Sequence, residues 1–314
     1  MLKLTPQSAL VGVLSGAASA VLAGSVLTQS SLAILLFFIS PLPVMLAGLS
    51  FGATATLVGA LACTMFVSFI VSTPAALLVA AVSMLPAALA VFLIALARPA
   101  DEVGGQADHI VWFPLGDTLF FCALLIAAAF VGIGIYGGYD IAFATEFATV
   151  FEQQFKAVNP EFAPSAEFAP SLANFIFYAV PVIQPAMFTM VLTTNLWLAL
   201  QLVRASGKLA RPKDNWPLSL RMPKAALPAF AVALASSFVS GPIGLLALVF
   251  CGVFAACFTM AGFAVLHERS RGKQWRTPVL VLAYISAFFF LPVLAVFIFL
   301  GLFDTRRTAP VSKA

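Results

Sequence analysis

Apolar residues in this chain occur in long uninterrupted runs, and charged residues are confined to the segments between them. Nine runs are long enough to cross roughly 30 Å of bilayer hydrocarbon as α-helices. They cover about residues 8–27, 31–50, 53–73, 74–97, 117–137, 171–203, 225–241, 243–266 and 278–303. A membrane β-barrel is excluded, because its strands alternate apolar and polar residues. The pattern predicts an all-α fold, a polytopic transmembrane helical bundle in a lipid bilayer.

The last run, 278–303, is interrupted near its middle by Pro292. Proline removes a helical hydrogen bond, so this run is either a ninth span or a re-entrant segment that turns back. A ninth span would place the tail, 304–314, outside, although the tail carries three basic residues. We expect residues 1–303 to form one membrane domain of about nine spans, or eight if the last segment is re-entrant, followed by a polar tail.

Composition supports this fold. Apolar residues make up 62% of the chain and charged residues 9%, whereas charged residues make up about 25% of an average soluble domain. A soluble fold could not cover its surface with so few charges. The net charge of +4 is small and confined to loops, which gives no indication of nucleic-acid binding.

The charged residues also predict an orientation. Segment 138–171 contains five acids and one Lys, whereas 204–224 contains six basic residues and one acid. Loop 267–276 has four basic residues and one acid. Because cytoplasmic loops are enriched in Lys and Arg, we expect 204–224 and 267–276 to face the cytoplasm and 138–171 to face outward. Counting back through five spans places the N-terminus in the cytoplasm.

Residues 139–158 have a different pattern from the spans. Phe143, Phe147, Phe151 and Phe155 recur at every fourth position, and charged or amide residues lie between them. This spacing predicts an external amphipathic helix that lies on the membrane surface or caps the bundle.

The run 171–203 combines polar residues with two prolines. Its candidate ligand-binding residues are Asn174, Tyr178, Gln184 and Asn195. The three amides fall within about 80° of one another on an ideal helical wheel. Pro181 has no N–H, so the carbonyl of Phe177 loses its helical donor and points into the same arc. These groups allow two interpretations. They bind a neutral or zwitterionic ligand in a cavity, or they form hydrogen bonds to neighbouring helices.

Two other patterns concern helix packing. Pro41 and Pro43 interrupt the second span, which predicts a bend that lines a cavity or is accommodated by neighbouring helices. Small residues recur at every fourth position of the first span, namely Gly12, Gly16, Ala20 and Gly24. Such a ridge lets another backbone approach closely, either inside the bundle or from a separate subunit.

Several kinds of chemistry lack their usual motifs. The chain has no G-x-x-x-x-G-K-[ST], so we expect any ATP hydrolysis to come from other subunits. It also lacks H-E-x-x-H and G-x-S-x-G motifs and has no ionisable residue in the middle of a span. Its four cysteines lie singly in apolar runs without ligand spacing. We expect no enzyme activity, catalytic residue, metal site or cofactor.

Three segments carry a resemblance to a known family: PLPVMLAGLSFG (41–52), GFAVLHERSRGK (262–273) and LGLFDTRR (300–307). They resemble the YybS-like family of predicted bacterial membrane proteins (domain of unknown function 2232). That family in turn is distantly similar to the substrate-binding S components of energy-coupling-factor vitamin transporters. S components dock through a small-residue face of their first helix onto a transmembrane coupling subunit with two ATPases. They usually have about six spans.

The resemblance implies a multi-pass protein of the bacterial cytoplasmic (inner) membrane. Our leading hypothesis is an S-component-like subunit that binds an unidentified small molecule for uptake powered by separate ATPases. The ridge at Gly12, Gly16 and Ala20 would then face the coupling subunit. The alternative is a non-transporting membrane scaffold for envelope assembly or division.

Overall fold

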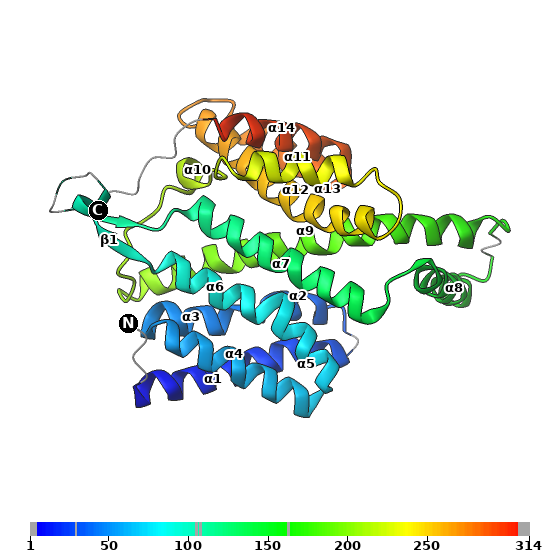
Figure 1. Cartoon of the computed structure of the whole chain (residues 1–314), viewed down its shortest axis with the longest axis horizontal. Helices are drawn as coiled ribbons and strands as arrows, with labels where there is room; N and C mark the ends of the chain where they lie inside the picture. Colours follow the sequence, from blue (N-terminus) through cyan, green and yellow to red (C-terminus); the bar gives the residue numbers. More distant parts are fainter. Residues whose placement is uncertain (1–4, 29, 104–105, 107–108, 162–163, 307–314) are drawn as a thin grey trace.

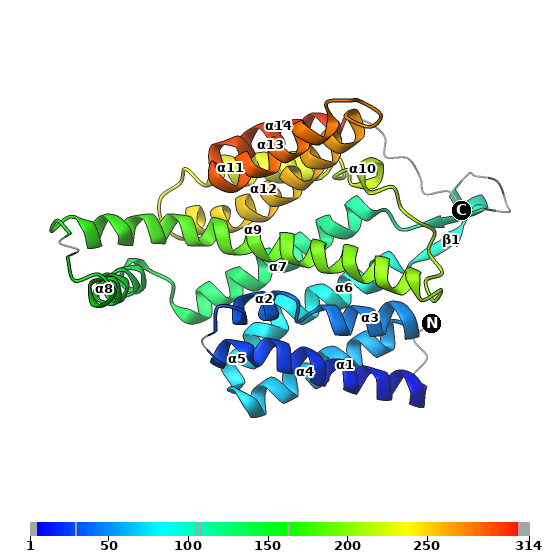
Figure 2. The same cartoon turned by 180° about the vertical axis from the view of Figure 1, so that it is seen from behind.

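The computed structural model describes residues 5–28, 30–103, 106, 109–161 and 164–306. It confirms the predicted all-α membrane bundle (Figures 1 and 2). In the described part of the chain, seven helical segments are long and apolar enough to cross a membrane, and three apolar helices are shorter. The predictions for the first four residues and for most of the tail, 304–314, lie outside the described residues.

The first group of helices lies along one side of the bundle, at the bottom of Figure 1. Its elements are α1 (Pro6–Gly24), η1 (Ser25–Thr28), α2 (Ala33–Phe38), α3 (Leu42–Phe51), α4 (Ala53–Ile70), α5 (Thr73–Val79), the π-helix η2 (Ala80–Met84) and α6 (Leu85–Ile94). The predicted bend in the second span is confirmed, because α2 ends at Phe38 and α3 starts at Leu42. Pro41 and Pro43 cannot donate to carbonyls of α2, but prolines fit the first turn of a new helix.

The second group crosses the middle of the molecule. Its elements are β1 (Ala97–Pro99), η3 (Ala100–Val103), β2 (Ile110–Trp112), α7 (Leu115–Gly137), α8 (Ile141–Val158) and α9 (Phe168–Ala205). The connection between α6 and α7 contains a small antiparallel ribbon in which Arg98 pairs with Val111. With 38 residues, α9 is about 57 Å long and continues through both of its prolines without a break.

The predicted amphipathic helix is α8, which starts where the Asp140 side chain accepts a hydrogen bond from the Phe143 N–H. It is seen nearly end-on in Figures 1 and 2, so it runs across the direction of the spans. Ala144 and Ala148 pack it against the first turns of α9. Its phenylalanine stripe is exposed.

The third group lies at the top of Figure 1. Its elements are α10 (Trp216–Ser219), α11 (Ala226–Ser236), α12 (Pro242–Arg269), α13 (Arg276–Phe289), η4 (Leu291–Val293) and α14 (Leu294–Asp304). The predicted span 225–241 is helical only over α11. Of the seven long spans, α12 is the most enclosed, and its Phe254 and Phe258 are among the largest fully buried side chains of the core.

The segment 278–303, expected to be either a ninth span or a re-entrant segment, does not form one continuous helix. Phe290 is extended, with φ −135° and ψ 85°, and separates α13 from α14. Pro292 has no N–H with which to continue α13, so the chain turns and α14 returns along α12. Gly262 and Gly301 allow this close packing, because a Cβ on either would overlap a backbone carbonyl of the other helix. This segment is therefore a hairpin of two short helices, α13 and α14.

The two ends of the bundle differ in charge. We call the end formed by β1–β2, residues 206–225, residues 270–275 and the end of α14 the basic end, and the end that carries α8 the acidic end (Figure 1). Between them, large apolar side chains point outward, including Phe69 (83% exposed) and Phe288 (78% exposed). An apolar outer surface of this extent requires a lipid bilayer around it.

Candidate functional site

The four candidate ligand-binding residues of α9 do not come together. Asn174 and Asn195 are 21 positions apart, which is about 31 Å along a continuous helix. Asn174, Tyr178 and Gln184 are exposed, whereas Asn195 is buried. The helical wheel showed that the amides share an arc, but it did not account for their separation along the helix axis. These residues cannot surround one small ligand.

Asn195 instead joins two helices. Its Nδ2 donates to the carbonyl oxygens of Phe38 and Val191, both at 2.8 Å. Phe38 ends α2, and the Leu42 N–H that would normally reach its carbonyl bonds to Ile39. The amide therefore satisfies the carbonyl that the break in α2–α3 exposes. The Asn195 Oδ1 is buried without a protein partner among the described residues, a position usually satisfied by an ordered water.

The carbonyl that Pro181 leaves free is also satisfied within the protein. The Tyr139 hydroxyl lies 3.1 Å from the Ile176 oxygen and 3.2 Å from the Phe177 oxygen, so both carbonyls share its proton. The Tyr139 ring stacks on Phe177 at 5.8 Å. Burial raises the pKa of Tyr139 to about 12, which keeps the donating proton in place.

The ridge of small residues on α1 faces α4. A Cβ added at Gly12 would lie 2.8 Å from the Ala55 oxygen, and one at Gly16 would overlap the Gly59 oxygen. Ala20 is buried in the same contact region. Gly24 lies at the looser end of the ridge, where the nearest atoms are 4.0 Å away. The ridge thus serves packing inside the bundle over most of its length.

The buried charges of the bundle gather at its basic end. Arg211 and Asp214 form a bidentate ion pair with distances of 2.7 and 2.9 Å, and their side chains are 2% and 1% exposed. The same guanidinium donates to the carbonyl oxygens of Ile94 and Phe113, at 3.1 and 2.9 Å. One side chain therefore fixes residues 206–225 to the end of α6 and to the start of α7.

A second arginine connects other segments at the same end. Arg221 donates to Asp304 at 2.8 Å and lies 3.5 Å from Glu268. These acids end α14 and α12, so the contact also holds both ends of the α13–α14 hairpin at the basic end. Gly116 of α7 lies against the Arg221 backbone, where a Cβ would overlap the carbonyl.

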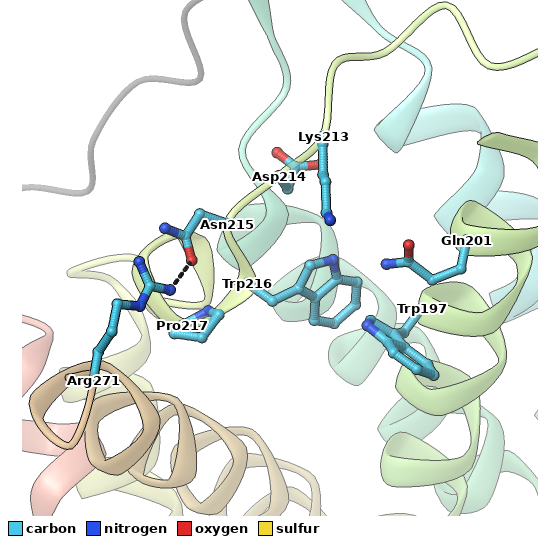
Figure 3. Close-up of a pocket in the computed structure, with 8 residues that line it drawn as sticks. All are labelled: Trp197, Gln201, Lys213, Asp214, Asn215, Trp216, Pro217 and Arg271. Carbon is cyan, nitrogen blue, oxygen red and sulfur yellow. Dashed lines mark hydrogen bonds between the residues drawn. The ribbon is translucent and has the colours of Figure 1, made fainter. Parts of the chain in front are cut away.

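A pocket of about 410 Å³ opens beside these ion pairs, between the end of α9 and the segment before α10 (Figure 3). It is lined by Trp197, Gln201, Lys213, Asp214, Asn215, Trp216, Pro217 and Arg271. Arg271 donates to the Asn215 side-chain oxygen at 3.0 Å. The Asp214 charge is neutralised by its ion pair with Arg211, so Lys213 and Arg271 give the lining a net positive charge. This is the candidate functional site.

No pattern in the sequence alone predicts this pocket. Tryptophans at span ends beside basic residues are a known sign of the membrane interface, and Trp197 and Trp216 carried that signal. That these two tryptophans line one pocket could not be inferred, because their proximity depends on the hydrogen bonds by which Arg211 holds residues 206–225 against the bundle. No group of three or more His, Cys, Asp or Glu that could hold a metal occurs among the described residues.

Residues 17–305 match the family described as "Predicted membrane protein (DUF2232)". The chain belongs to this family. The match covers nearly the whole bundle and confirms the family named from the segments at 41–52, 262–273 and 300–307. The description of the DUF2232 family gives membrane location and no activity. No curated protein and no solved structure matches the chain, so the similarity to S components stays a prediction.

Proposed function

We propose that this DUF2232 protein is a non-catalytic, non-transporting scaffold of the bacterial cytoplasmic membrane, which presents a fixed docking surface at its basic end. The observation that carries the proposal is the pair of buried arginines, Arg211 and Arg221. Together they connect the ends of α6, α12 and α14, the start of α7 and residues 206–225. A protein that docks partners in envelope assembly or division would use such a surface.

The length and order of this end support docking. Connections between bundle helices usually need about 2–8 residues, whereas about twenty residues, 206–225, separate α9 from α11. Ordering a residue costs roughly 1–2 kcal/mol of backbone entropy, so a long connection stays ordered only when contacts compensate. Arg211 and Arg221 provide these contacts, and exposed Lys208, Lys224 and Lys273 surround them.

The basic end faces the cytoplasm in this proposal, because Lys and Arg accumulate in cytoplasmic loops. The hairpin of α13 and α14 strengthens this orientation. It leaves the start of α13 and the end of α14 at the basic end together with loop 267–276. Every strongly basic segment in the described chain then lies at one end.

The uptake hypothesis, with a small-molecule ligand and a coupling subunit with ATPases, has less support. The amide of Asn195 and the carbonyl of Phe177 make hydrogen bonds within the protein. The ridge expected to meet a coupling subunit is covered by α4 at Gly12 and Gly16. What still favours uptake is the lack of an ATPase motif and the distant family resemblance.

Cross-linking in living cells separates the two functions. A photo-reactive amino acid is placed at the exposed positions Lys224 and Lys273 of the basic end, with exposed Glu161 at the acidic end as the matched control. Cross-linked proteins are identified by mass spectrometry after purification in mild detergent. Envelope-assembly or division proteins captured from 224 and 273, but not from 161, support the scaffold.

Two results would overturn the proposal. The first is recovery of a transmembrane coupling subunit with its ATPases, together with a small molecule that co-purifies. The second is capture of partners from position 161 alone, because the docking surface would then lie at the acidic end.

A further inference from the structure

The pocket at the basic end has a donor-rich lining. Figure 3 shows the Lys213 side chain, the Gln201 amide and the nitrogen edges of the Trp197 and Trp216 indoles turned toward a common space. Ammonium and indole nitrogens donate hydrogen bonds and accept none. Such a lining suits an anion.

Four donor groups of this pocket, on Gln201, Lys213 and the two tryptophans, are also unengaged, whereas Arg271 donates to Asn215. Arg204 lies 3.5 Å from the Gln201 side-chain oxygen, an orientation that turns the amide NH₂ away from Arg204. Among the described residues, Lys213 and the indole N–H groups of Trp197 and Trp216 have no hydrogen-bond or ion-pair partner. Arg271 adds a second positive charge at the far side of the pocket. These groups are available to a ligand.

The pocket lies where the lipid-facing surface of α9 meets the basic end. Trp197 is 43% exposed and shares a helix face with exposed Ile183 and Thr194. Indoles prefer the level of lipid headgroups, and basic pockets beside spanning helices bind anionic headgroups. An acyl chain can follow this face of α9 while the headgroup enters the pocket. A volume of about 410 Å³ lies within the usual range for small-ligand sites.

We propose that this pocket binds the phosphate headgroup of an anionic membrane lipid, with Lys213 and Arg271 as its charged contacts and Trp197, Gln201 and Trp216 as neutral donors. The site is independent of the scaffold function, since a lipid can bind whether or not a protein partner docks. Lys213 holds the phosphate, and Trp216 donates from the pocket wall.

Native mass spectrometry of the full chain in detergent tests the site with three probes: phosphatidylglycerol, phosphatidylcholine and soluble glycerol 3-phosphate. The variants are Lys213→Gln, which removes the charge, and Trp216→Phe, which keeps the ring and removes the donor. Lys224→Gln removes an exposed charge of the same end outside the pocket and is the matched control. Size-exclusion profiles check that each variant is folded.

We expect phosphatidylglycerol to bind at least about tenfold more tightly than phosphatidylcholine. Lys213→Gln should weaken its binding by about tenfold and Trp216→Phe by about threefold, whereas Lys224→Gln should leave it unchanged. Equal binding of both lipids, or equal losses in Lys213→Gln and Lys224→Gln, would overturn the proposal. Competition by glycerol 3-phosphate at the same concentration as the lipid would also overturn the proposal. The phosphate that occupies the pocket would then come from a soluble molecule and not from a lipid.

Discussion

The most decisive test of the fold is removal of the guanidinium of Arg211. This side chain is 2% exposed and makes four hydrogen bonds, two to Asp214 and two to the carbonyl oxygens of Ile94 and Phe113. The substitution Arg211→Met keeps much of the side-chain length and removes every donor. It leaves the Asp214 carboxylate and two carbonyls without the donor that satisfied them.

The expected loss of unfolding free energy follows from the Asp214 carboxylate, which stays buried without its partner. Removing one partner of a buried ion pair costs about 3–5 kcal/mol, because the other charge is left uncompensated. This is a large share of a typical unfolding free energy of about 5–15 kcal/mol. Asp214→Asn should cost less, because Arg211 keeps its two carbonyl acceptors. The double variant Arg211→Met/Asp214→Asn should cost less than the sum of its single variants, since it leaves no buried charge.

Unfolding in detergent micelles with rising mole fraction of dodecyl sulfate, followed by far-ultraviolet circular dichroism, measures these differences. Lys156→Met is the matched control, because the exposed Lys156 forms an ion pair with the partly exposed Glu152 at the acidic end. An exposed pair one helical turn apart contributes only about 0.3–0.5 kcal/mol.

The reasoning is refuted if Arg211→Met destabilises no more than Lys156→Met. It is also refuted if the costs of the two single variants at Arg211 and Asp214 add fully in the double variant. Either result would mean that the pair is not coupled and that another contact holds residues 206–225.

Three further predictions concern the helix contacts. Asn195→Leu should cost about 0.6 kcal/mol, and at most about 1.7 kcal/mol, in the same unfolding assay, because the end of α2 loses its donor. Tyr139→Phe should cost about 1 kcal/mol in the same assay, and a stability equal to wild type would contradict the bond to α9. Gly16→Leu should abolish the peak of the folded protein in size-exclusion chromatography, since its Cβ meets backbone, whereas Gly24→Ala should leave that peak unchanged.

Much of the fold was predictable because membrane helices follow one-dimensional rules. A run of about 20 apolar residues has to form its hydrogen bonds internally, so its location in the sequence determines a helix. The bend at Pro41 and Pro43 and the amphipathic helix 139–158 followed from proline chemistry and a period of four. The extent of 225–241 was not predictable, because nothing in its apolar pattern marks the end of α11 at Ser236.

The site was less predictable, because it depends on contacts between distant segments. The amide of Asn195 meets Phe38 across 157 positions, and Arg211 meets Ile94 across 117 positions. A single sequence shows that these polar groups need partners but does not show which partners they find. Polar groups on one face of α9 need not share one site, because they can lie far apart along the helix axis. In the structure, Asn195 satisfies the break between α2 and α3, and Tyr139 satisfies the carbonyl of Phe177. Asn174, Tyr178 and Gln184 are exposed.

In the C-terminal segment, the positive-inside rule corrects the number of spans that hydropathy alone predicts. With nine full spans, the basic tail that begins near Arg306 would lie at the acidic end, which the positive-inside rule disfavours. The extended backbone at Phe290 and the missing N–H of Pro292 turn the chain within the bundle. The ion pair between Arg221 and Asp304 then holds the end of α14 at the basic end. In this segment, hydropathy favours a membrane location and the basic residues favour the cytoplasmic end. Two short helices in a hairpin satisfy both preferences, whereas one long helix satisfies only the preference for a membrane location.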